Sequence, residues 1–102
     1  MDELGATLAA LADPSRRALL QRLAYGPATS GQLADLLPTI SRPAVSQHVR
    51  ALAHAGLLRT TVRGRQHWHE LATPALTGVA YWITTLLGTA AGAPGLIGSE
   101  ES

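Results

Sequence analysis

Two short helices joined by a tight turn are the feature of this sequence that most restricts its fold. Thr29 is followed three residues later by Gln32, which is the signature of a capping box at a helix start, and Pro38 ends that helix. Ser41 then begins the next helix as its N-cap. This spacing predicts a helix-turn-helix. The first of the two helices should turn three side chains inward: Leu33, Leu36 and Leu37.

The helix that begins at Ser41 has an apolar face and a polar face. Val45, Val49 and Leu52 recur at positions i, i+4 and i+7, so we expect them to pack on the core. The outward side carries Arg42, Ser46, Gln47 and Arg50. A helix of this kind fits the major groove of DNA, where glutamine pairs with adenine and arginine with guanine or phosphate. The hydroxyls of Ser41 and Ser46 suit a phosphate or a base edge.

A β-hairpin is predicted after the helix pair. Its strands are expected over Leu57 to Val62 and over His67 to Leu71. The turn between them reads Arg63-Gly64-Arg65-Gln66. Its two arginines are placed to reach a neighbouring groove or the phosphate backbone.

Two more helices are predicted before the helix pair. Leu4, Leu8 and Leu11 form one apolar stripe on a short first helix. Asp13-Pro14 begins the second, because aspartate is a good N-cap and proline suits the first helical position. Gly26-Pro27 ends it.

A long uncharged helix is predicted near the C-terminus, opened by Pro74. Apolar side chains nearly surround it, which indicates burial on more than one side. The apolar positions are Leu76, Val79, Trp82, Ile83, Leu86 and Leu87. Glycines and prolines break the pattern from Gly92 onward, so we expect one domain over residues 1–91 and a flexible tail over 92–102.

The same uncharged stretch is long enough to cross a bilayer, which raises the alternative of a transmembrane segment. It contains four threonines and three glycines between Ala75 and Ala93, and it lacks flanking basic anchors. We therefore expect no membrane partner. The start of the chain, Met1-Asp2-Glu3, is acidic and has no signal-peptide pattern, which favours a cytoplasmic protein.

The charges of the chain are unevenly distributed. All eight basic residues are arginines that lie between Arg16 and Arg65, and Asp35 is the only acid within that stretch. Such a local excess attracts phosphate, although a solvated arginine-rich face is the simpler alternative. The chain has no cysteine, which excludes disulfides, thiolate metal sites and thiol chemistry. No catalytic set stands out, so we expect neither an enzyme nor a cofactor.

Three segments resemble the ArsR/SmtB family of bacterial regulators. They are LADPSRRALLQRL (Leu11 to Leu23), SRPAVSQHVRALAHAGLL (Ser41 to Leu58) and RGRQHWHEL (Arg63 to Leu71), and the resemblance extends from Leu4 to about Leu87. It implies a winged helix-turn-helix, mainly α with a small β-hairpin wing. It further implies a homodimeric repressor that binds double-stranded DNA at a palindromic operator.

The resemblance also assigns residues to two surfaces. It implies DNA contact by Ser41, Arg42, Ser46, Gln47, His48, Arg50, Arg63, Arg65 and Gln66. It implies that the first and last helices pair across a two-fold axis, through Leu4, Leu8, Leu11, Val79, Trp82, Ile83, Leu86 and Leu87. Tyr81 and Trp82 are alternatives for lining a ligand pocket, but aromatic side chains more often fill an interface.

Metal-sensing members of that family use a cysteine pair near the helix-turn-helix, or acidic and histidine ligands along the last helix. Here Leu33 to Ser41 has no thiol, and Pro74 to Ala91 has no histidine, aspartate, glutamate or cysteine. We expect no metal at either place. His67 and His69 alternate on a strand and share a face, which makes them weak candidates for zinc; a packing role in the wing is favoured.

Two alternatives to a constitutive repressor follow from the same residues. A winged helix can also act as an adaptor that binds protein, in which case its arginine face would be dispensable. The chain can also be a switch that responds to an unknown small molecule or to a metal bound without thiols, and such an effector would raise the melting temperature.

Overall fold

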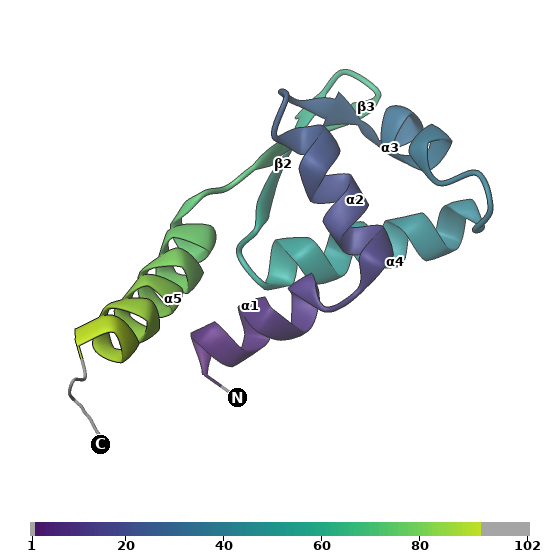
Figure 1. Ribbon diagram of the computed structural model, residues 1–102. Helices are drawn as coiled ribbons and strands as arrows, with labels where there is room; N and C mark the ends of the chain where they lie inside the picture. Colours follow the sequence, from purple (N-terminus) through teal and green to yellow (C-terminus); the bar gives the residue numbers. More distant parts are fainter. Residues whose placement is uncertain (1, 93–102) are drawn as a thin grey trace.

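The computed structural model describes residues 2–92 (Figure 1). Its elements are α1 (Glu3–Leu11), α2 (Pro14–Leu23), β1 (Ala28–Thr29), α3 (Ser30–Leu36), α4 (Arg42–His54), β2 (Leu58–Arg63), β3 (Gln66–Leu71) and α5 (Pro74–Gly92). The architecture is mainly helical with one small antiparallel sheet, as a winged helix-turn-helix requires, so the expected fold class is confirmed. The tail predicted for 92–102 lies outside the described residues except for Gly92, which ends α5.

The predicted helix starts are set by local hydrogen bonds. The Asp13 carboxylate accepts bonds from the backbone N–H groups of Ser15 and Arg16, at 2.8 and 3.2 Å. Thr29 and Gln32 exchange side-chain-to-backbone bonds in both directions, which completes the capping box. The hydroxyl of Ser41 accepts a hydrogen bond from the backbone N–H of Ala44, in the first turn of α4. Each cap satisfies backbone N–H groups that a helix leaves without partners.

The sheet has the strand order β1-β3-β2, so β3 is its central strand. Strand β1 was not predicted, because two residues are too few to show a pattern of alternation. The hairpin turn is also tighter than expected. Arg63 pairs with Gln66, which leaves a two-residue loop whose first position, Gly64, has a φ of 61°. Pairing with β1 ties the hairpin to the start of α3.

The core lies where α2, α3, α4 and the start of β2 meet. Its fully buried large side chains are Leu19, Leu33, Leu52 and Leu57. The prediction for Leu36 was wrong, since 42% of that side chain is exposed. Helix α3 has only seven residues and turns a narrow stripe to the core, so Leu33 and the following C-cap residue Leu37 fill the available contact.

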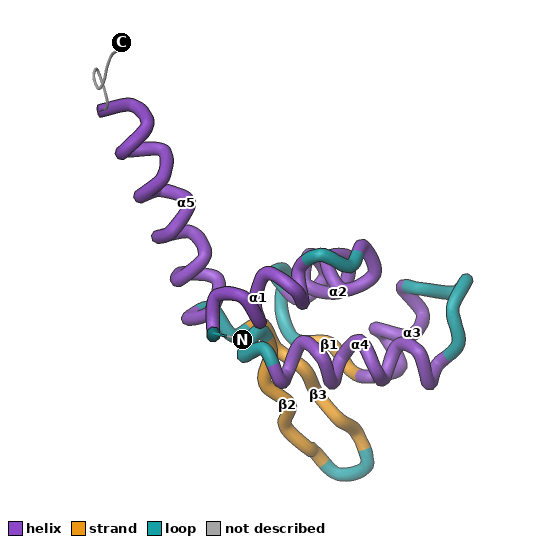
Figure 2. The backbone as a smooth tube through the Cα atoms, turned by 90° about the horizontal axis from the view of Figure 1, so that it is seen from below, coloured by secondary structure: helices purple, strands orange, loops and turns teal. Residues whose placement is uncertain are grey.

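Helix α5 projects from the body of the molecule as an arm (Figures 1 and 2). The principal extents of the fold, 61 × 27 × 26 Å, reflect this projection. Near its start α5 packs beside α1, and Val79 is the buried residue in it. Along the residues that the structure describes, no helix combines the length and the apolar character needed to cross a membrane.

Candidate nucleic-acid interface

Helix α4 divides its side chains between core and solvent as its spacing predicts. Val45 and Leu52 are buried, and Val49 is partly buried against the same core. The polar side chains expected on the outward face are all exposed: Ser41, Arg42, Ser46, Gln47 and Arg50. Contact of these side chains with DNA stays a prediction, but the face that would make it is open to solvent.

His48 differs from the other residues assigned to this face. Its ring is half-buried, and Nδ1 accepts a hydrogen bond of 3.3 Å from Nε of Arg16 on α2. The neighbouring Asp13 carboxylate belongs to the same cluster. Partial desolvation raises the pKa of Asp13, but hydrogen bonds from the backbone N–H groups of Arg16 and Ser15 outweigh it, so the pKa lies below its usual value. His48 therefore connects α4 to α2.

The arginines between Arg16 and Arg65 differ in their partners. Arg17 and Arg22 donate to backbone carbonyls of their own chain, those of Leu11 and Gly26, and Arg16 donates to His48. Arg42 is paired with Asp35 at 3.2 Å and Arg59 with Glu70 at 3.4 Å. Both ion pairs are exposed, so they contribute little to stability and can open when a phosphate approaches.

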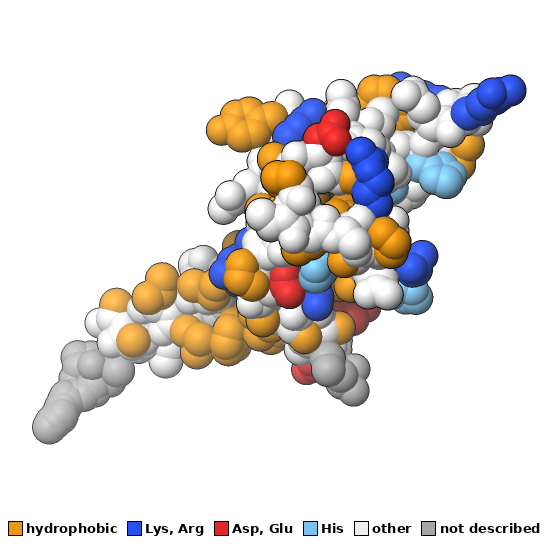
Figure 3. All heavy atoms as spheres, turned by 90° about the vertical axis from the view of Figure 1, so that its right-hand side faces the viewer, with side chains coloured by type: hydrophobic (Ala, Val, Ile, Leu, Met, Phe, Trp, Pro, Cys, Tyr) orange, Lys and Arg blue, Asp and Glu red, His pale blue; other side chains and the backbone are white. Residues whose placement is uncertain are grey.

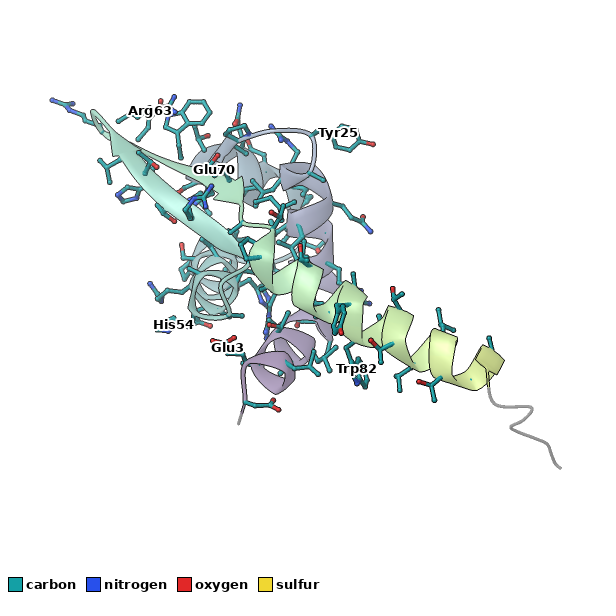
Figure 4. All side chains as sticks on the ribbon, turned by 90° about the vertical axis from the view of Figure 1, so that its left-hand side faces the viewer. Glu3, Tyr25, His54, Arg63, Glu70 and Trp82 are labelled. Atoms are coloured by element: carbon teal, nitrogen blue, oxygen red, sulfur yellow. The ribbon has the colours of Figure 1, made fainter. Side chains whose placement is uncertain are left out.

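The hairpin carries its arginines away from the body of the molecule. Figure 4 shows Arg63 near the hairpin tip, far from Trp82 on α5. The Arg63 guanidinium lies 5.4 Å from the centre of the Trp68 ring, a cation–π contact that holds it along the strand. Within residues 2–92, neither Arg65 at the tip nor Arg50 on α4 has an ion-pair partner. These two arginines are therefore available to phosphate.

His69 on β3 is buried and fully hydrogen-bonded. Its Nε2 lies 2.8 Å from the hydroxyl of Ser30 on α3, and its Nδ1 lies 2.9 Å from the hydroxyl of Thr60 on β2. Burial lowers the pKa of His69, and the charge of His67 adds to the shift. The ring thus links the helix-turn-helix to the wing. Sequence reasoning missed Ser30 and Thr60, because only the pairing of β3 with both neighbouring strands brings them to His69.

The hydrogen bonds of His69 argue against a zinc site at His67 and His69, the two weak candidates from the sequence. Both ring nitrogens of His69 face hydroxyl groups, whereas His67, two residues earlier, is exposed. Among the residues that the structure describes, no three side chains of the metal-binding types gather around a common point. The arrangement of His69 is that of a structural histidine.

The lowered pKa of His69 predicts a pH-dependent stability. Below pH 6.5, the ordinary histidine value, the unfolded chain binds a proton at His69 before the folded chain does. The free energy of unfolding should therefore fall as the pH drops from 6.5 towards the lower pKa of the folded state, and should level off above 6.5. Urea unfolding between pH 7.5 and 5 should show a smaller fall in His69→Gln than in the wild type. Equal falls would contradict this assignment.

The surface assigned to pairing of two copies is only partly exposed in the single chain: Leu4 and Leu11 are half-buried and Val79 is buried, whereas the other assigned side chains are open to solvent. Leu8 on α1 is 36% exposed, and exposure along α5 rises from Trp82 (41%) to Leu87 (67%). The space-filling view shows hydrophobic side chains along the projecting arm (Figure 3). Trp82 points to the side on which α1 lies (Figure 4). The burial on several sides that the sequence predicts is not reached within one chain.

Comparisons with known proteins agree with this geometry. The family described as "Helix-turn-helix domain" matches residues 11–61. The chain is 41% identical over 86 residues to the HTH-type transcriptional regulator Rv2034 of Mycobacterium tuberculosis, covering 79% of each chain. It is 30% identical over 78 residues to the transcriptional repressor SdpR of Bacillus subtilis, covering 76% of this chain and 86% of that one.

A solved structure, that of the ArsR family transcriptional regulator RHA00566, has the same fold. It superposes with a TM-score of 0.81 at 33% identity, and the match covers 88% of this chain and 92% of the other. The matched region therefore includes the helix-turn-helix and the wing together.

Proposed function

Because this chain belongs to the ArsR/SmtB-type family of winged helix-turn-helix transcriptional regulators, we propose that it is a homodimeric repressor that binds a palindromic operator. DNA binding follows from the family and from its regulator relatives. The proposal adds the oligomeric state, the symmetry of the site and the direction of control. SdpR, which is described as a repressor, supports the last of these.

The observation that carries the proposal is the shared border between α4 and the wing. Arg42, Ser46 and Arg50 on α4 line the same cleft as Thr60 and His67 on the hairpin. The outward face of α4 and one face of the hairpin are thus parts of a single surface. When α4 enters a major groove, the hairpin can reach the adjacent backbone or groove.

The exposed apolar stripe supports the dimer. A lone chain of this size that leaves Trp82, Ile83, Leu86 and Leu87 in contact with water loses much of its hydrophobic stabilisation. Pairing of α1 and α5 with a second copy removes these side chains from water and relates the two α4 helices by a two-fold axis. A two-fold protein that reads DNA selects a two-fold site.

Selection of bound sequences from a random DNA pool tests the proposal directly. We expect an imperfect palindrome whose half-sites are separated by about one helical turn, roughly 10 base pairs, or a multiple of it. A single non-symmetric half-site would contradict the dimer, and failure to enrich any DNA would favour a protein-binding adaptor.

Affinity for the selected operator is expected to fall steeply with salt. Arg50, Arg63 and Arg65 supply six cations in a dimer, and neutralising about six phosphates implies a loss of roughly a thousandfold between about 50 and 200 mM salt. Fluorescence anisotropy with labelled operator measures this loss. An affinity that does not change with salt would mean that phosphate contacts are not the source of binding.

A further inference from the structure

A cleft of about 430 Å³ is lined by residues of α3, of the hairpin and of the side of α4 where its apolar and polar faces meet. Four of the residues that line it are apolar: Ala34, Val45, Val49 and Ala53. Volumes of this size accommodate a small organic molecule. The cleft is therefore large enough for a ligand, and it lies within the surface assigned to DNA.

The polar groups around the cleft favour an anion. Arg50 and Arg42 lie at its border, together with His67, and no acidic side chain is part of its lining within residues 2–92. Arg42 already forms an ion pair with Asp35, in which Nη2 lies 3.2 Å from Oδ1. Arg50 has no ion-pair partner among the described residues. A carboxylate or phosphate group would meet the unpaired Arg50 here, next to a wall that has no acidic side chain among residues 2–92.

The hydroxyls of Ser30 and Thr60, which both bond to His69, also supply one hydrogen-bond donor to the cleft. Neutral imidazole has one N–H, so His69 donates to one of the two hydroxyls and accepts from the other. Whichever of Ser30 and Thr60 accepts from the ring keeps its own O–H free. Both residues line the cleft, so one hydroxyl donor is available there and is fixed in place by a buried ring.

We propose that this cleft binds a small organic anion, a carboxylate or a phosphate monoester attached to a compact apolar group, which opposes DNA binding. The four apolar side chains would take the body of the ligand, and Arg50 with a hydroxyl of the Ser30–Thr60 pair would take its charged group. Since Arg50 and Ser46 belong to the outward face of α4, a ligand held there competes with DNA for the same side chains. The opposing effect rests on the proposed function, whereas binding itself does not.

Titration of the full chain with phenyl phosphate, followed by ¹H–¹⁵N NMR, tests the binding step. We expect saturable shifts at the amides of Ser46, Arg50, Thr60 and His67. Benzyl alcohol has the same ring without the charge, and sodium chloride at equal ionic strength controls for screening; neither should reproduce the shifts. If either does, no anion site exists in this cleft.

Substitutions at three positions locate the site. Of Ser30→Ala and Thr60→Val, the variant that removes the free O–H should weaken phenyl phosphate binding about tenfold, because it removes a hydrogen bond to a charged group. Thr61→Val is the matched control, since Thr61 is on the opposite face of β2 and does not line the cleft. Arg50→Gln should weaken binding at least as much, and it leaves folding intact because Arg50 is exposed. Unchanged affinity in Arg50→Gln overturns the proposal, even if Thr60→Val fails to fold.

Competition between phenyl phosphate and labelled operator then distinguishes a free small anion from the backbone phosphates of DNA as the ligand of the cleft. Phenyl phosphate that displaces DNA beyond the salt control supports an effector site. Weaker DNA binding by Thr60→Val, with no binding of the free anion, assigns the cleft to backbone phosphate and overturns the proposal. Phenyl phosphate that binds to a protein without any affinity for DNA supports the anion site and contradicts the proposed function instead.

Discussion

Ile83→Asp is expected to convert the protein to monomers and to abolish operator binding at concentrations where the wild type is fully bound. Ile83 is at the centre of the apolar stripe of α5 and is 44% exposed in the single chain, so the substitution has little to disturb within one copy. In a dimer built on this stripe, each copy would bury an unpaired carboxylate, at a cost of roughly 3–5 kcal/mol. The dissociation constant of the dimer should rise by more than about a thousandfold.

Tyr81→Asp is the matched control for this substitution. Tyr81 is two residues away but on the opposite side of α5, where it is 74% exposed. Tyr81→Asp should therefore leave the dimer intact. An intact dimer would also argue against the alternative that Tyr81 lines a ligand pocket in the interface. Light scattering coupled to gel filtration measures the mass, and anisotropy measures operator affinity. A dimeric Ile83→Asp, or an equally monomeric Tyr81→Asp, would place the interface elsewhere.

Gln47→Ala and Arg65→Ala are expected to impair DNA binding in different ways. Gln47 is exposed on α4, where its amide suits bidentate contact with adenine. Its loss should weaken operator binding by about 1–3 kcal/mol for each half-site and leave random DNA unaffected. Arg65 is at the wing tip without an ion-pair partner in residues 2–92. Its loss should weaken operator and random DNA alike, and should reduce the salt slope by about two for a dimer.

Parallel salt titrations of both variants on operator and random DNA distinguish the two roles. Gln21 is an exposed glutamine on α2 that is not among the residues assigned to DNA contact. Gln21→Ala therefore controls for the loss of an exposed side-chain amide and should behave as the wild type. If Gln47→Ala and Arg65→Ala change both affinities by the same factor, the division between base reading by α4 and backbone contact by the wing is wrong.

The positions of the helices and of the hairpin were predictable because their signals are local. Thr29 bonds to Gln32 and Ser41 to Ala44, three residues apart, so both the signal and its consequence lie within one turn of helix. The buried side of α4 follows equally from the spacing of Val45 and Leu52. Strand β1 had no such signal, since two residues become a strand only when β3 lies beside them.

The partners of the arginines, unlike the helix positions, could not be predicted from the sequence. Eight arginines in one stretch indicate a cationic face, and three of them also bond to groups of their own chain, at Leu11, Gly26 and His48. A sequence shows how many charges are present, whereas the packing of helices decides which guanidinium groups find carbonyls or rings of their own chain. Arg50 and Arg65 are the arginines that have no carbonyl, ring or carboxylate partner among the described residues.

The amino-acid sequence was sufficient to predict where the helices begin, which side of α4 is apolar, and that the chain resembles a family of DNA-binding regulators. The packing of the folded chain was needed to show that Arg16 bonds to His48, 32 positions away, and that His69 bonds to Thr60 and to Ser30, which is 39 positions away. The reason is physical. Caps and periodicity depend on neighbours within a turn, while these bonds require three elements to meet at hydrogen-bonding distance, a geometry set by how the leucine core packs.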